Sequence, residues 1–98
     1  MLEREFQAAL IKKIKALLPG CVVLKNDSSY LQGIPDLLVL HGQNWAMLEV
    51  KASFHATYQV NQEYYLDILN DMSFATMICP ENEEEVLREL HKALRLRR

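Results

Sequence analysis

Three charged residues in the middle of the chain have the types and spacing that suit metal-dependent chemistry on phosphate. Asp36 follows a proline, and thirteen residues later comes Glu49, separated by one valine from Lys51. Carboxylate oxygens suit Mg²⁺, which is usually held by one or two of them together with waters and substrate phosphate. The metal polarises a phosphoryl oxygen and lowers the pKa of bound water, while a lysine orients that water or stabilises developing negative charge. The set therefore indicates hydrolysis of phosphodiester bonds.

The two segments that carry these residues are predicted to pair as a β-hairpin. Residues 36–40 and 45–51 are strand-like runs separated by the polar residues 41–44. A two-residue turn at Gly42-Gln43 and a four-residue loop over 41–44 both make opposed residue numbers sum to 85. Asp36 then faces Glu49 with Cβ atoms roughly 4.5–5.5 Å apart, where two like charges are destabilising unless a cation compensates. The two-residue period of a strand places Lys51 on the same face as Glu49.

A third carboxylate is predicted to come from the start of the chain. Residues 2–18 have the pattern of an amphipathic helix that ends at Pro19-Gly20, with an apolar stripe made of Phe6, Leu10, Ile14 and Leu17. At 100° per residue, Glu3 falls near the centre of that stripe, whereas Glu5 points about the opposite way. We therefore expect Glu3, rather than Glu5, to reach a site at the strand ends.

The remaining segments complete a single α/β domain that spans residues 1–98. Residues 21–24 and 74–79 are strand-like, and two further helices are expected after the N-cap Asn61 and after a capping-box-like pair, Asn82 and Glu85. Their apolar faces are predicted to be Tyr64, Tyr65, Ile68, Leu69 and Met72 in the first, and Val86, Leu87, Leu90 and Leu94 in the second. Because a helical crossover favours parallel pairing and a hairpin is antiparallel, the four-stranded sheet should be mixed.

The quoted residues resemble a known nuclease signature. Pro35-Asp36, followed by Glu49-Val50-Lys51, looks like the PD-(D/E)XK motif, and the predicted element order matches the restriction-endonuclease-like αβββαβ core of that superfamily, with a C-terminal helix added. More narrowly, Glu3 and Gln7, the runs GIPDLL and LEVK, and Asn61-Gln62 resemble the virus-type replication-repair nuclease (VRR-NUC) family in its small stand-alone phage-like form. The resemblance covers nearly the whole chain.

This resemblance implies an endodeoxyribonuclease that depends on Mg²⁺ or Mn²⁺. Glu3, Asp36, Glu49 and the backbone carbonyl of Val50 would bind the metal, Lys51 would assist the attacking water, and Gln62 would support the site. Small stand-alone members are similar to Holliday junction resolvases, which implies a homodimer acting on branched DNA such as four-way junctions. A two-fold dimer would also supply the two symmetric cuts that a junction requires. The expected location is the cytoplasm, that of a bacterial host if the protein is phage-encoded.

Two alternatives stay open. One is a non-catalytic DNA-binding module of the same fold that binds junctions through basic patches without metal. The other is a less selective nuclease of repair or restriction type. A formal net charge of −2 excludes a generic basic nucleic-acid coat, but local patches remain, namely Lys12, Lys13 and Lys15 in the first helix and the arginines of residues 95–98. Each patch could contact DNA phosphates. Otherwise the lysines are the solvated face of the first helix, and the arginines complement the C-terminal end of the last helix.

Composition limits the other possibilities. Half of the 98 residues are apolar and 24% are charged, which is typical of a compact soluble domain and excludes a disordered tail. The uncharged apolar runs are far shorter than the roughly 20 residues of a membrane helix, and the acidic start does not resemble a secretory signal. The remaining side chains of interest have bland predictions: Cys21 and Cys79 as reduced, buried thiols; His41, His55 and His91 as solvated; and Tyr58, Tyr64 and Tyr65 as core or dimer contacts, at least one of them core, with base stacking as the alternative.

Overall fold

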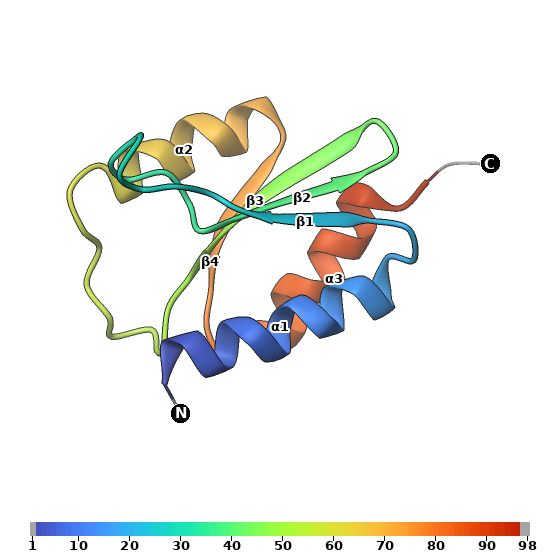
Figure 1. Cartoon of the computed structure of the whole chain (residues 1–98), viewed down its shortest axis with the longest axis horizontal. Coiled ribbons are helices and arrows are strands. Elements are labelled where there is room, and N and C mark those ends of the chain that lie inside the picture. The colour runs from blue at the N-terminus through green and yellow to red at the C-terminus, as the bar shows by residue number, and fades with distance from the viewer. Residues whose placement is uncertain (1, 97–98) are drawn as a thin grey trace.

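Residues 2–96, the part of the chain described by the computed structural model, form three helices and four strands in the predicted order (Figure 1). Their bounds are α1 (Glu3–Leu17), β1 (Val22–Lys25), β2 (Leu37–His41), β3 (Asn44–Val50), α2 (Gln62–Met72), β4 (Phe74–Ile78) and α3 (Glu83–Leu94). The strand bounds differ from the predicted ones by about one residue, as is usual for element ends. Arg97 and Arg98 of the predicted basic tail lie outside the described residues.

The four strands form one mixed sheet in the order β1-β2-β3-β4, as predicted. Strands β1, β2 and β3 pair antiparallel, and the crossover through α2 makes β4 parallel to β3. Leu37 pairs with Leu48, and His41 pairs with Asn44, so opposed numbers sum to 85. Of the two hairpin connections considered, the two-residue turn is present, and its Gly42 has a positive φ of 62°.

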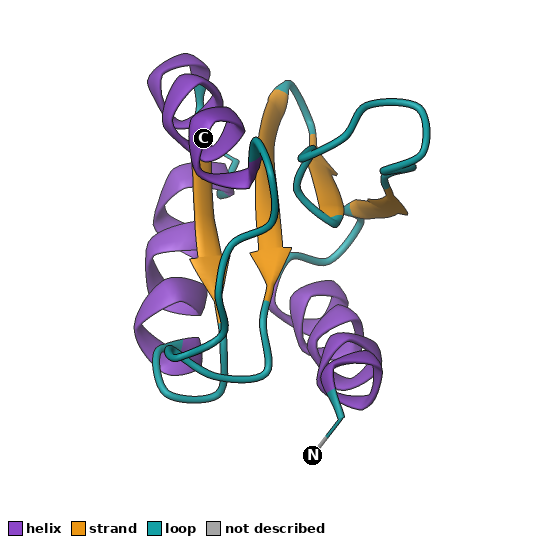
Figure 2. Ribbon diagram, turned by 90° about the vertical axis from the view of Figure 1, so that its left-hand side faces the viewer, coloured by secondary structure: helices purple, strands orange, loops and turns teal. Residues whose placement is uncertain are grey.

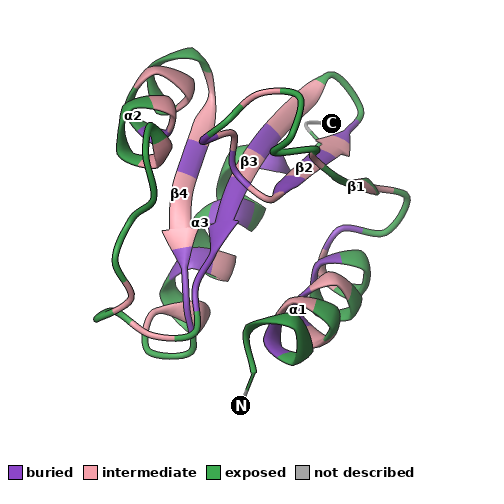
Figure 3. Cartoon of the chain, turned by 60° about the vertical axis from the view of Figure 1, so that its left-hand side comes forward, coloured by how far each residue is buried: buried purple, intermediate pink, exposed green. Residues whose placement is uncertain are grey.

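The hydrophobic core lies on the face of the sheet that α1 and α3 cover, whereas α2 packs on the other face (Figures 1 and 2). Ala46, Leu48 and Val50 of β3 point into this core, and their neighbours along the strand point to the α2 side. Figure 3 shows the buried positions concentrated along β3 and the facing sides of the helices. Within residues 2–96, no helix has the length and apolar character needed to span a membrane.

The predicted apolar face of α2 is partly wrong. Leu66 is the buried residue of this helix, whereas Tyr64 and Met72 are 60% and 68% exposed. The helix packs on β4 and the adjoining β3, so only a narrow stripe of it meets the sheet. Tyr65 is half-buried and Tyr58 is exposed, so the prediction that at least one of the three tyrosines belongs to the core is also wrong.

Two predicted helix caps occupy the right positions but do not act through their side chains. Asn61 precedes α2 with a left-handed backbone, φ 68°, and Asn82 precedes α3; neither side chain bonds to its helix. Asn82 Oδ1 instead accepts a hydrogen bond from the N–H of Cys79 at 2.8 Å, and its Nδ2 donates to the Met77 carbonyl at 3.1 Å. Its side chain thus closes the turn between β4 and α3.

The prediction that His41 is solvated is wrong. Its side chain is 7% exposed, with Nδ1 2.7 Å from the Leu94 carbonyl oxygen and Nε2 3.2 Å from that of Pro19. The last residue of β2 points to the core side, where the ends of α1 and α3 meet. His55 and His91 are exposed, as predicted. Both cysteines are free thiols; Cys79 is buried as predicted, but Cys21 is only half-buried.

Candidate active site

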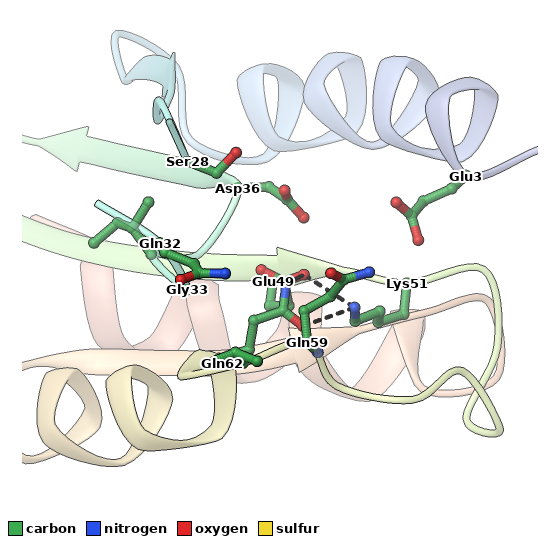
Figure 4. Close-up of a pocket in the computed structure, with 11 residues that line it drawn as sticks. Glu3, Ser28, Gln32, Gly33, Asp36, Glu49, Lys51, Gln59 and Gln62 are labelled. Carbon is green, nitrogen blue, oxygen red and sulfur yellow. Dashed lines mark hydrogen bonds and ion pairs between the residues drawn. The ribbon is translucent and has the colours of Figure 1, made fainter. Parts of the chain in front are cut away.

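The predicted site residues meet at the end of the sheet where β2 begins and β3 ends. Asp36 immediately precedes β2 and Lys51 immediately follows β3, and these ends adjoin because the two strands are antiparallel. A cavity of about 310 Å³ lies there (Figure 4). Its walls include all five side chains predicted from the sequence, and the complete lining is Glu3, Ser28, Gln32, Gly33, Ile34, Asp36, Glu49, Lys51, Gln59, Val60 and Gln62.

A buried hydrogen-bonded network occupies one wall of this cavity. Lys51 Nζ donates to Gln62 Oε1 at 2.9 Å, and Gln62 Nε2 donates to Glu49 Oε2 at 2.8 Å. The same Glu49 oxygen lies 3.4 Å from Lys51 Nζ. Glu49 and Lys51 are only 2% and 6% exposed. Charges are costly to bury unless they are paired, and this network compensates that cost. Its hydrogen bonds also hold the carboxylate and the ammonium in fixed positions.

The second oxygen of Glu49 is less well satisfied. Oε1 is buried and has no hydrogen-bond partner among the described residues. Burial foremost, and then the negative charge of Asp36, raise the pKa of Glu49 from about 4.5 to about 7, although the nearby ammonium of Lys51 opposes the shift. A buried carboxylate oxygen without a donor, next to a second carboxylate, is suited to a cation.

Asp36 is held by the backbone on both sides. Its Oδ2 accepts a hydrogen bond from the N–H of Val50 at 2.8 Å, and its carbonyl accepts one from the N–H of Asn26 at 2.8 Å. Asn26 Nδ2 also donates to the Pro35 carbonyl at 2.8 Å. The carboxylate is therefore fixed next to the end of β3. Val50 contributes its N–H here; the metal-binding role of its carbonyl oxygen stays a prediction.

Helix α1 supplies Glu3, and not Glu5, to the cavity. Figure 4 shows the carboxylate of Glu3 on the same side of the cavity as Asp36 and across from Glu49 and Lys51. Glu5 Oε1 instead accepts a hydrogen bond from the N–H of Leu2 at 3.1 Å, at the start of the helix. Gln7, which belongs to the family resemblance, is half-buried and does not line the cavity.

Gln62 reaches the site because it lies on the face of α2 that packs on the sheet. It is four residues before the buried Leu66, so the two side chains share one helix face. The N–H of Gln59 donates to Gln62 Oε1 at 2.7 Å and orients the amide. The loop before Asp36 contacts this helix start closely: a Cβ on Gly33, whose φ is 95°, would lie 2.6 Å from Asn61 Cβ. Close contact between these loops therefore sets the position of Gln62 relative to Asp36.

Several cavity residues were not identified from the sequence. Ser28, Gln32 and Gln59 line the cavity from loops. Such residues follow neither the helical nor the strand period, so the sequence pattern contained no signal for them. Their common feature is that they belong to the two loops, 26–36 and 51–61, that border the strand ends.

The side chains of the cavity suit Mg²⁺ rather than a metal ion that needs three or more protein ligands. Among residues 2–96, no group of three or more histidine, cysteine, aspartate or glutamate side chains is close enough together to hold a metal. Mg²⁺ does not need such a group, since it usually keeps several waters and is bound through one or two carboxylates plus substrate phosphate. Asp36 and Glu49, with the bare Oε1 of Glu49, meet that requirement.

Comparison of the chain with protein-family models, with curated proteins and with solved structures finds no match. The α/β fold with a mixed four-stranded sheet rests on the structure itself. The resemblance to the VRR-NUC family continues to rest on its motifs, and the roles that it implies for individual residues stay predictions.

Proposed function

We propose that this protein is a Mg²⁺- or Mn²⁺-dependent endonuclease that hydrolyses phosphodiester bonds in branched DNA. The observation that carries this proposal is the meeting of Asp36, Glu49 and Lys51 in one cavity, with a Glu49 oxygen that has no hydrogen-bond partner within residues 2–96. Two carboxylates and a lysine in this arrangement match the needs of metal-dependent phosphodiester hydrolysis.

The carboxylates would hold the metal. Asp36 and Glu49 are the principal ligands in this proposal, and the family resemblance adds Glu3, which lines the cavity from α1, and the Val50 carbonyl. When bound, the metal polarises a phosphoryl oxygen and lowers the pKa of a water molecule. The hydrogen bond from the N–H of Val50 keeps Asp36 oriented without occupying its second oxygen.

The protein's own cation acts next to this position. Lys51 is buried, and in a site sheltered from water its charge stabilises developing negative charge more strongly than in solvent. Gln62 accepts a hydrogen bond from Lys51 and donates one to Glu49, so it is a positioning residue for both. Because the ammonium of Lys51 is already held in place, the site needs little reorganisation when negative charge develops on the phosphate.

The proposal includes a homodimer, and an open sheet face supports it. On the α2 side, β1 and β2 are not covered by a helix, and Val22 and Leu24 are 50% and 45% exposed. Strand pairing aligns these two residues with further apolar residues of β2 and β3. The rows are Val22, Leu40 and Trp45, and Leu24, Leu38 and Met47. A second copy related by two-fold symmetry would bury this face and place two active sites on one junction.

A cleavage assay tests the proposed function. Four-way junctions, flaps and linear duplex are incubated with the protein in Mg²⁺, in Mn²⁺ and in EDTA. We expect metal-dependent cleavage that favours branched DNA, and a loss of about 100-fold or more in Asp36→Ala because a metal ligand is removed. The matched control is Asp67→Ala, which removes an exposed carboxylate from α2.

Three outcomes would count against parts of the proposal. Full activity of Asp36→Ala would show that the site is wrong. Junction binding without metal and without cleavage by the wild type would favour the non-catalytic DNA-binding module. Equal cleavage of linear and branched DNA would favour the less selective nuclease.

A further inference from the structure

A second hollow adjoins the cavity that contains the carboxylates. It measures about 410 Å³ and is lined by Asn26, Asp27, Tyr30, Leu31 and Ile34. Ile34 also lines the first cavity, so the two spaces share a wall. The first space presents carboxylates, amides and an ammonium, whereas three of the five residues around the second are aromatic or aliphatic.

Tyr30 is the unusual member of this lining. It is 89% exposed, so its ring gives almost nothing to the stability of the fold. By comparison, Tyr58 is 42% exposed and contacts Lys51, and Tyr64 stacks edge-on against Tyr65 with ring centroids 5.2 Å apart. Tyr30 therefore presents an unoccupied aromatic face at the edge of the hollow.

The loop that carries Tyr30 is held by hydrogen bonds. Asp27 Oδ1 accepts from the N–H and the hydroxyl of Ser29 at 2.9 and 2.6 Å. The N–H groups of Tyr30 and Leu31 donate to the Asp27 carbonyl at 3.2 and 3.3 Å, and the N–H of Ile34 donates to the Leu31 carbonyl at 3.2 Å. The loop is tied directly to the backbone of Asp36 through Asn26. The backbone that carries the Tyr30 ring therefore has a defined position relative to the site.

We infer that this hollow receives an unpaired nucleobase, which stacks on Tyr30 while a neighbouring phosphate of the same strand enters the carboxylate cavity. The inference rests on the proposed function and deepens it. A nucleotide strand alternates apolar base faces with anionic phosphates. The hollow offers the apolar surface, and the cavity would accept a phosphate through Lys51 and the metal of the proposed function. A base inside a duplex is covered by its neighbours, so only a base freed at a branch or flap can enter.

Unpaired DNA should therefore be bound better than paired DNA, and Tyr30 should be the source of the difference. Stacking on an aromatic side chain tolerates every base, because each base has a π face. The hydroxyl of Tyr30 is not needed for stacking, so the ring alone should be enough. Asp27 remains next to the base, but its carboxylate accepts two hydrogen bonds from Ser29 and is engaged within the loop.

The test compares a flap DNA that carries 2-aminopurine in the unpaired strand beside the branch with the same strand fully paired. Affinity and 2-aminopurine fluorescence are measured in Ca²⁺, and cleavage is measured separately in Mg²⁺. We expect Tyr30→Ala to bind the flap about tenfold more weakly and to lose the quenching seen with the wild type, with the paired duplex nearly unaffected. Tyr30→Phe should behave as the wild type, and the control Tyr64→Ala should leave the affinity for both flap and duplex unchanged.

The outcomes separate this inference from the proposed function. If the wild type cleaves branched DNA but Tyr30→Ala binds the flap equally well, the inference fails and the proposed function stands. An equal loss on flap and duplex also overturns it, because the ring would then not read unpaired bases. If flap binding depends on Tyr30 but no cleavage occurs in Mg²⁺, the base site stands and the proposed nuclease fails. If the wild type binds no DNA, both are wrong.

Discussion

At the scale of single residues, the candidate site contains a buried carboxylate that is not fully satisfied. Glu49 shares one oxygen with Gln62 and Lys51 and leaves the other without a partner in the described part of the chain. A purely structural ion pair would be expected to satisfy both oxygens, because an unpaired buried polar atom costs stability. In the free protein this unsatisfied oxygen of Glu49 is therefore unfavourable, and a bound cation would satisfy it.

This cost predicts an unusual pH dependence of stability. The pKa of Glu49 is raised to about 7 in the folded protein, chiefly by burial, from an ordinary value of 4.5. Between these two values the folded state binds more protons than the unfolded state, so the free energy of unfolding contributed by Glu49 falls as pH rises. The loss should amount to at most about 3 kcal/mol. Urea unfolding in EDTA across pH 4.5 to 7.5 measures it.

The comparison for this prediction is the variant Glu49→Gln. An uncharged amide of nearly the same shape cannot titrate, so the difference in unfolding free energy between wild type and variant should change in favour of the variant as pH rises through that window. A difference that stays constant with pH would contradict the assignment. Mg²⁺ should reduce the loss in the wild type, since it binds the ionised form of the folded protein.

At the scale of elements, close contact between loops sets the relative position of the strand ends and α2. Gly33 lies against Asn61 at the start of α2, and the next residue, Gln62, is the first of that helix and lines the cavity. The contact requires a residue without a Cβ and with a positive φ. His41 has a comparable role at the opposite end of the hairpin, where it joins the ends of α1 and α3.

The contact at Gly33 can be tested with a pair of glycines. Gly33→Ala should lower the free energy of unfolding by more than about 2 kcal/mol and also reduce cleavage, because the added Cβ would lie 2.6 Å from Asn61 Cβ and displace the start of α2. Gly20 has a similar φ of 87° but nothing within 4 Å of the added Cβ. Gly20→Ala should therefore cost only about 1 kcal/mol of backbone strain and leave cleavage unchanged. Equal effects of the two substitutions would show that backbone strain alone matters.

The role of His41 predicts a second contrast. His41→Phe keeps an aromatic ring but removes both ring nitrogens, which lie 2.7 Å from the Leu94 carbonyl oxygen and 3.2 Å from that of Pro19, so the carbonyl that accepts the ring N–H loses its donor. Chemical denaturation should show a loss of about 1–3 kcal/mol. His91→Phe, on the exposed side of α3, should stay within about 0.5 kcal/mol of the wild type. A His41→Phe variant of unchanged stability would show that these hydrogen bonds do not hold the helix ends.

At the scale of the whole molecule, helices cover the two faces of the sheet unequally. Helices α1 and α3 seal one face, while α2 covers the other only over β3 and β4. The apolar residues Val22 and Leu24 of β1, an edge strand of the sheet, are left exposed at the surface. A surface of this kind is unusual for a protein that acts alone, and the proposed homodimer gives it a use.

The dimer can be separated from the active site by a single substitution. We expect the wild type to be dimeric at micromolar concentration by light scattering, and Leu24→Lys to be monomeric, because a charge on the apolar face would lose its hydration on association. Met72→Lys, at an exposed position of α2, should remain dimeric. A monomeric wild type that still cuts both strands of a junction at symmetric positions would contradict the homodimer.

The sequence by itself determined the features that depend on short-range periodicity. The strand period and the hairpin turn placed Asp36 opposite Glu49 and put Lys51 on the same face. The helical period selected Glu3 over Glu5, and the structure brings Glu3 to the cavity. These inferences succeed because backbone geometry repeats every 2.0 or 3.6 residues whatever the chain packs against.

Only the tertiary structure decided the features that depend on what each element packs against. The narrow contact of α2 with the sheet buried Leu66 and left Tyr64 exposed, and the meeting of two helix ends buried His41. The cavity residues from the loops, and the hollow beside Tyr30, arise where segments distant in sequence come together. Loops have no period, and burial depends on neighbours that a local pattern does not contain, so these positions followed from the packing of the complete chain.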